Sequence, residues 1–139
     1  MRAHRSAVAL VAWTFLVWTT RIGNIWRDTD LDTAAKWART ALALSFTVLA
    51  LGVVVALRRR APAPLVAAVG VLAAWTTGVW IVRGAGIVAA DHAAGFKVVH
   101  TVLAVVSIVL AAFAWRETRR PALTRHGERP DDLAPRSAR

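Results

Sequence analysis

The chain has 139 residues, of which 57% are hydrophobic, and its mean hydropathy is +0.49. The apolar residues fall into four blocks separated by charged residues, a pattern that argues against a soluble globular domain. The formal net charge is +10, from 18 Lys and Arg against 8 Asp and Glu. The sequence contains no cysteine, which excludes disulfides, thiolate nucleophiles and cysteine-ligated clusters.

Each apolar block has about the length of a membrane-spanning helix, which needs about 20 residues to cross about 30 Å of hydrocarbon. We expect the first helix at Ser6 to Ile25. No charged residue occurs from Thr40 to Leu57 or from Ala61 to Val82, and Val98 to Trp115 contains a single histidine. The sequence therefore predicts an all-α membrane protein with four transmembrane helices.

The connecting segments have their own signals. The stretch from Arg58 to Pro64 predicts a short turn whose prolines suit the start of the third helix. That helix is expected to end near Arg83, before a flexible segment containing Gly84, Gly86 and Gly95, with residues 87–90 as an alternative extra helical turn. We expect a transmembrane domain at residues 1–120. Residues 121–139, rich in proline and charge, are expected to form a disordered basic cytoplasmic tail.

The distribution of positive charge predicts the orientation. If the N-terminus is inside, 12 Lys and Arg are cytoplasmic and 6 are external, which follows the positive-inside rule with both termini in the cytoplasm. The predicted location is the plasma membrane, as a multi-pass protein. Arginines at helix ends are explained by topology and by anionic lipid headgroups, so no nucleic-acid partner is expected. The external set is Arg21, Arg27, Lys36, Arg39, Arg83 and Lys97.

The sequence also repeats itself. Seven residues recur at an offset of 62, so that Ala12, Trp13, Thr14, Val17, Trp18, Arg21 and Ile25 match Ala74, Trp75, Thr76, Val79, Trp80, Arg83 and Ile87. At an offset of 61, Asp30, Lys36, Thr40, Leu42 and Ala43 match Asp91, Lys97, Thr101, Leu103 and Ala104. In this second register Arg39 corresponds to His100.

The repeat predicts two helical hairpins, repeat one at about residues 6–60 and repeat two at about residues 64–120. Because each repeat crosses the membrane twice, both insert in the same orientation and should be related by a pseudo-two-fold axis along the membrane normal. The first helix is then a retained span, and the alternative of a cleaved signal peptide is rejected.

Basic and aromatic residues gather toward the outer ends of the helices. Two interpretations remain open. In the first, Arg21 and Arg83 snorkel, pair with Asp30 and Asp91 or their neighbours, and orient the hairpins, while the tryptophans anchor the helices at the interface. In the second, the basic residues form a pocket for an anionic lipid or small anion. The candidate anion-binding residues are Arg21, Lys36, Arg39, Arg83, Lys97 and His100, and the candidate anchors are Trp13, Trp18, Trp75 and Trp80.

Signals for catalysis and cofactors are weak. A bis-histidine haem needs two imidazoles at one depth, and only His100 lies in an apolar block unless two copies of the chain meet. No metal site, cofactor or nucleophile motif is predicted. A proton-coupled exporter would be expected to use a carboxylate within a helix, and the predicted helices contain none. We expect a protein that is not an enzyme. Gly70, Ala74 and Gly78 form a small-residue stripe that favours intramolecular helix packing over an oligomer interface.

The chain resembles a group of small four-helix integral membrane proteins of high-GC actinobacteria. The resemblance rests on Ala-Trp-Thr at 12–14 and 74–76, on Val-Trp-x-x-Arg at 17–21 and 79–83, and on Phe-Lys-Val-Val-His-Thr-Val-Leu-Ala at 96–104. It implies the membrane topology and no catalytic residue. The expected function is that of an accessory or structural interaction protein, with membrane lipids, a homodimer or a larger membrane complex as partners. The alternative is a binder or transporter of an anionic lipid or small anion.

Overall fold

The computed structural model describes the backbone of residues 2–91 and 93–127 and the side chains of residues 5–91 and 93–120. Within these residues the chain folds into four long helices: α1 (Arg2–Arg27), α2 (Thr33–Arg58), α3 (Pro62–Ala89) and α4 (Ala94–Gly127). All four contain a stretch long and apolar enough to cross a membrane. The predicted all-α class and the number of apolar helices are therefore confirmed, and this is the composition of a multi-pass membrane protein.

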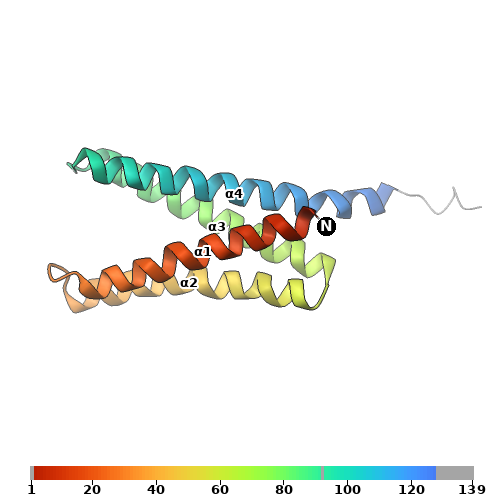
Figure 1. The fold of residues 1–139 in the computed structure, drawn as a ribbon, viewed down its shortest axis with the longest axis horizontal. Coiled ribbons are helices and arrows are strands. Elements are labelled where there is room, and N and C mark those ends of the chain that lie inside the picture. Colours follow the sequence, from red (N-terminus) through yellow and green to blue (C-terminus); the bar gives the residue numbers. More distant parts are fainter. Residues whose placement is uncertain (1, 92, 128–139) are drawn as a thin grey trace, which may run out of the picture.

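The helices pack as two antiparallel hairpins, α1 with α2 and α3 with α4 (Figure 1). The hairpins contact each other through α1 with α4 and through α2 with α3. Figure 1 shows that the two hairpins diverge toward the end that carries the α1–α2 and α3–α4 connections. At the opposite end α1 lies beside α4. We call the diverging end the loop end of the bundle.

The connections follow from local chemistry. Asp32 caps α2, because its Oδ1 accepts a hydrogen bond of 2.7 Å from the backbone N of Ala35. Between α2 and α3 the chain turns at Arg60, whose φ of 50° lies in the left-handed region that a non-glycine residue seldom adopts. Pro62 then begins α3, where its missing N–H costs nothing. The predicted turn and helix start are confirmed.

Two helices run farther than the sequence predicts. Helix α3 continues through Gly84 and Gly86 to Ala89 instead of ending near Arg83. A glycine weakens a helix by about 1 kcal/mol without having to end it, so the alternative of an extra turn at residues 87–90 is realised as far as Ala89. Helix α4 crosses Pro121 and ends at Gly127, so residues 121–127 of the predicted tail are helical. The remainder of that tail, residues 128–139, lies outside the described residues.

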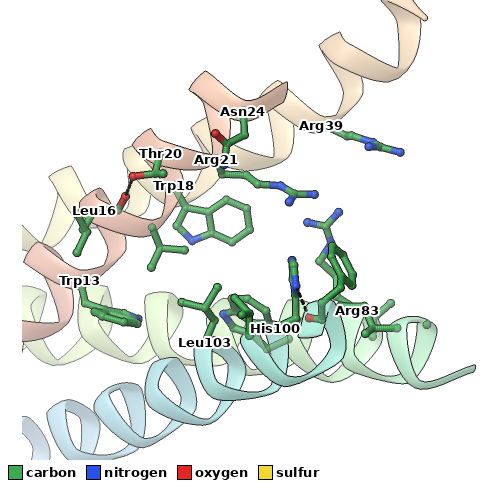
Figure 2. A pocket seen from close by; sticks show the side chains of 17 residues that line it. Trp13, Leu16, Trp18, Thr20, Arg21, Asn24, Arg39, Arg83, His100 and Leu103 are labelled. Atoms are coloured by element: carbon green, nitrogen blue, oxygen red, sulfur yellow. Dashed lines mark hydrogen bonds between the residues drawn. The ribbon is translucent and has the colours of Figure 1, made fainter. Parts of the chain in front are cut away.

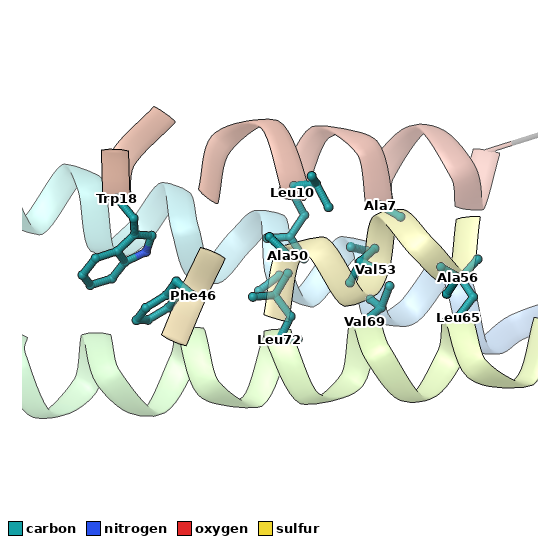
Figure 3. Close-up of a cluster of buried hydrophobic side chains, with 14 of the residues drawn as sticks. Ala7, Leu10, Trp18, Phe46, Ala50, Val53, Ala56, Leu65, Val69 and Leu72 are labelled. Carbon is teal, nitrogen blue, oxygen red and sulfur yellow. The ribbon is translucent and has the colours of Figure 1, made fainter. Parts of the chain in front are cut away.

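The core is built from one face of each helix (Figure 3). On α2, Phe46, Ala50 and Val53 are fully buried and follow helical spacing, and they meet Leu72 and Val69 of α3. Many large apolar side chains on all four helices are exposed, as expected for helices whose outer faces contact lipid. Small residues in the core let the helices approach closely, while the exposed side carries Val and Leu.

Candidate functional site

A cavity of ≈ 720 Å³ lies between the diverging hairpins, in the half of the bundle nearer the loop end (Figure 2). Each helix contributes one basic residue to its lining: Arg21 from α1, Arg39 from α2, Arg83 from α3 and His100 from α4. Four of the six basic residues singled out in the sequence therefore meet in one space. A cavity of this size falls within the range of about 300–1,000 Å³ that holds a single small ligand.

The guanidinium groups of Arg21 and Arg83 point toward each other across this cavity, and Arg39 lies farther out along α2 (Figure 2). Both Arg21 and Arg83 are half-buried. The charges of Arg21 and Arg39 both repel Arg83. Nε of Arg21 is buried and has no hydrogen-bond partner among the described residues. The cavity therefore concentrates positive charge from both hairpins.

The carboxylates near the loop end form no ion pair with these arginines among the described residues. Among the side chains of residues 5–91 and 93–120, no carboxylate lies within the 4.0 Å of an ion pair with Arg21, Arg39 or Arg83. Asp28 attracts Arg21 only from a longer distance. The expected pairing of Arg21 with Asp30 and of Arg83 with Asp91 is thus absent from the described structure. Loop geometry explains this, because the first loop turns on the hydrogen bond of 3.0 Å from the Asp30 N–H to Asp28 Oδ1, and Asp91 is exposed.

His100 completes the basic lining from α4. Its Nδ1 lies 2.9 Å from the carbonyl oxygen of Phe96, one helical turn earlier. A carbonyl oxygen can only accept, so this hydrogen bond requires the proton on Nδ1. The neutral ring then carries a lone pair on Nε2, and only the doubly protonated ring offers a second donor. The ring of Phe96 lies 3.9 Å from the imidazole between centroids and helps to hold its orientation.

Most of the remaining lining is apolar, with Thr20 and Asn24 as its polar members. Leu16 and Val17 come from α1, and Phe96, Val99 and Leu103 come from α4. Leu16 is 62% exposed and Val99 is 55% exposed, so part of this lining also belongs to the outer surface of the bundle. Parts of the cavity lining on α1 and α4 are therefore exposed at the surface of the bundle. The cavity combines a basic region with an apolar one.

The two predicted lysines lie elsewhere. Lys36 and Lys97 do not line the cavity. Nζ of Lys97 instead lies 3.5 Å from the carbonyl oxygen of Val88, near the α3–α4 connection. Position along the helix explains why the lysines are not at the cavity. Lys36 precedes Arg39 by three residues, Lys97 precedes His100 by three, and both lysines lie closer to the loop end.

The tryptophans differ from the expected interface anchors. Trp18 and Trp80 are buried inside the bundle, at 5% and 6% exposure. Trp18 stacks on Phe46 with ring centroids 3.8 Å apart and an interplanar angle of 16°. The exposed tryptophans near the loop end are Trp26 and Trp37, which meet edge to face at 5.2 Å. Their position between the α1 and α2 ends, which sequence reasoning did not single out, suits the headgroup region better.

The other two tryptophans connect the hairpins. Nε1 of Trp13 donates to Oγ of Ser107 at 2.9 Å, and Nε1 of Trp75 donates to Oγ of Ser45 at 3.0 Å. Each bond runs from the first helix of one hairpin to the second helix of the other. Sequence reasoning missed the two serines, although they are separated by the same 62 positions as the two tryptophans. The two serines do not match at the offset of 61 that relates the other repeated residues of α2 and α4.

Comparison with protein-family models, with curated proteins and with solved structures finds no match to this chain. The cavity is therefore interpreted from its own chemistry. Among the described residues no three histidine or carboxylate side chains gather as a metal site would require. Three guanidinium groups, which are permanent cations and hydrogen-bond donors, are suited to hold an anion.

Proposed function

We propose that this protein is a non-enzymatic membrane protein that binds an anionic amphiphile in the cavity between its two hairpins. The anionic group lies among Arg21, Arg39 and Arg83, and the apolar part lies against the α1 and α4 walls. The observation that carries the proposal is that three guanidinium groups line one cavity without a carboxylate partner in the described part of the chain. Basic groups gathered in this way at a membrane segment are costly unless an anion neutralises them.

The exposed apolar residues of the cavity lining support an amphiphile over a fully water-soluble anion. A lipid-like molecule can enter between α1 and α4, where Leu16 and Val99 are exposed, without crossing the bilayer. Its charged group then meets Arg21 and Arg83 near the loop end, at the depth where arginine side chains reach headgroups. The proposed partner is thus a membrane lipid or a related amphiphile.

The proposal includes a topology in the plasma membrane, with both termini cytoplasmic and the cavity in the outer half. The excess of 12 over 6 basic residues supports this orientation. It also includes a pseudo-two-fold relation between the hairpins. The reciprocal bonds from Trp13 to Ser107 and from Trp75 to Ser45 support that relation, because each maps onto the other at an offset of 62.

Native mass spectrometry of protein gently extracted from its own membrane tests the proposed function. The wild type should retain an anionic amphiphile, which the double variant Arg21→Gln/Arg83→Gln should lose. The double variant Lys36→Gln/Lys97→Gln is the matched control, because it removes the same charge outside the cavity and should retain the amphiphile. Circular dichroism confirms that each variant is folded.

Equal retention by wild type and Arg21→Gln/Arg83→Gln would overturn the proposal. A protein partner in fixed stoichiometry, with no retained amphiphile, would instead favour the accessory role that the sequence suggests.

A further inference from the structure

We infer that the anionic group held in the cavity is a phosphate monoester, that is, a terminal phosphate with two negative charges. This inference rests on the proposed function and specifies the class of ligand. It follows from the number of cations that line the cavity and from the lack of neutralising acids among the described residues.

The positive charge at the cavity favours a ligand with two negative charges. Arg21, Arg39 and Arg83 remain protonated in proteins, so the cavity carries three positive charges before His100 is considered. A carboxylate or a phosphate diester brings one negative charge and leaves most of the repulsion between the arginines uncompensated. A phosphate monoester carries about −1.5 to −2 at pH 7 and neutralises most of it.

The positions of the three arginines can be compared with the free oxygens of each kind of phosphate. Arg21 and Arg83 point toward each other across the cavity, and Arg39 lines it from farther out along α2 (Figure 2). A terminal phosphate has three free oxygens arranged around its bond to the rest of the molecule, and each oxygen can accept from a different guanidinium. A phosphate diester has two free oxygens and an ester group on both sides. With its additional free oxygen, a monoester can accept from Arg39 as well as from Arg21 and Arg83, and it therefore fits the three cations better.

Both hairpins contribute basic residues to the cavity. Arg21 and Arg39 come from the α1–α2 hairpin, while Arg83 and His100 come from the α3–α4 hairpin. The charges of the two arginines repel Arg83 across the space where the hairpins diverge. A dianion bound by all three arginines bridges the hairpins at this end. Binding should therefore raise the thermal unfolding temperature of the full chain.

The experiment measures binding of single-chain probes to the full-length protein in a neutral saccharide detergent at pH 7.5. Lysophosphatidic acid carries the phosphate monoester, lysophosphatidylglycerol carries a diester with the same acyl chain, and lysophosphatidylcholine carries no net charge. Glycerol 3-phosphate carries the monoester without a chain. Lysophosphatidic acid should bind at least about tenfold more tightly than lysophosphatidylglycerol, since charge-assisted hydrogen bonds are the strong ones.

Variants and pH locate the effect. Arg39→Gln should reduce the preference for lysophosphatidic acid over lysophosphatidylglycerol by about tenfold, whereas Lys36→Gln should leave the preference unchanged. At pH 5.5 the monoester gains a proton, because its second pKa is about 6, and the preference should fall. The groups that face the ligand are the three arginines and His100. The comparison is therefore made in the His100→Gln variant, where the arginines keep their charge and the ratio of the two affinities reports the ligand.

The outcomes separate the two proposals. Equal binding of lysophosphatidic acid and lysophosphatidylglycerol, both above lysophosphatidylcholine, would overturn the monoester inference and leave the proposed function standing. Equal binding of all three would overturn both. If glycerol 3-phosphate binds as tightly as lysophosphatidic acid, the monoester inference holds but the apolar chain contributes nothing, which overturns the amphiphile.

Discussion

The indole Nε1 of Trp13 donates a hydrogen bond of 2.9 Å to Oγ of Ser107 and so joins α1 to α4. Ser107 in turn donates to the carbonyl oxygen of Leu103 in its own helix at 2.7 Å. The serine hydroxyl therefore both donates and accepts, which satisfies a polar group that lipid could not satisfy. The bond lies where α1 and α4 meet, next to the cavity that Trp13 also lines.

The Trp13–Ser107 bond should have a measurable coupling energy. Trp13→Phe keeps an aromatic ring and removes the donor, while Ser107→Ala removes the acceptor. In a double-mutant cycle we expect a coupling of about 0.6 kcal/mol, the usual size for hydrogen bonds between membrane helices. Reversible unfolding in mixed detergent micelles measures it. A coupling of zero would show that the bond adds no stability.

The second inter-hairpin bond gives an independent copy of this measurement. The cycle of Trp75→Phe with Ser45→Ala should give a coupling of similar size, because the bond of 3.0 Å has the same donor and acceptor types. Trp26→Phe is the control, since Trp26 packs on Trp37 near the α1–α2 connection and joins no hairpins.

Gly70 should tolerate no side chain. A Cβ built at this position would lie 2.5 Å from Cζ3 of the Trp115 ring, closer than two carbons can approach. We expect Gly70→Ala to lower the free energy of unfolding by about 1–3 kcal/mol, the usual cost of overpacking. Gly78→Ala is the matched control, because nothing lies within 4 Å of its Cβ position and alanine favours a helix. An equal loss in both variants would contradict the contact.

The three residues of the predicted small-residue stripe lie in different surroundings. Gly70 packs within the chain against α4, as expected for intramolecular packing. Ala74 and Gly78 are exposed, so the stripe rotates out of the contact after one turn. Only its first member serves helix packing among the described residues.

Arg21 should destabilise the protein when no ligand is bound. Arg21→Gln removes repulsion with Arg39 and a buried Nε without a partner, at the loss of a weaker attraction to Asp28. We expect the unfolding temperature of delipidated Arg21→Gln to equal or exceed that of the wild type by a few degrees. Intrinsic tryptophan fluorescence measures it, and the gain should shrink at high salt.

Lys36→Gln is the control for this measurement, because it removes one positive charge outside the cavity. A drop of several degrees in Arg21→Gln alone would mean that the guanidinium supports the fold. That result would return the arginines to the structural interpretation, in which they orient the hairpins.

The orientation of the bundle can be tested directly, because the chain has no native cysteine. Asp30→Cys lies in the α1–α2 connection and Arg59→Cys lies in the α2–α3 turn. A membrane-impermeant maleimide should label the first in intact cells and the second only after lysis. The reverse result would move the basic cavity to the cytoplasmic side.

Much of the fold could be predicted from local patterns. The charge-free runs located α2 and α3, and Pro62 marked the start of α3 where the structure has it. The sequence did not decide between an end of α3 near Arg83 and an extra turn at residues 87–90, because Gly84 and Gly86 resemble a loop, and the helix runs to Ala89. For the site, the sequence identified the basic residues but not which of them meet.

The sequence by itself determined four apolar helices and a set of basic residues toward one end, since both follow from composition and from residue order along each helix. The tertiary structure decided that Arg39 joins Arg21 and Arg83 at a cavity while Lys36 does not. It also decided that Trp18 stacks inside the bundle and that Asp30 stays away from the arginines. The physical reason is that the rotation of each helix and the divergence of the hairpins depend on how side chains from different helices fit together. Phe46 and the Trp–Ser contacts are examples. Residue spacing along a single helix does not contain that information.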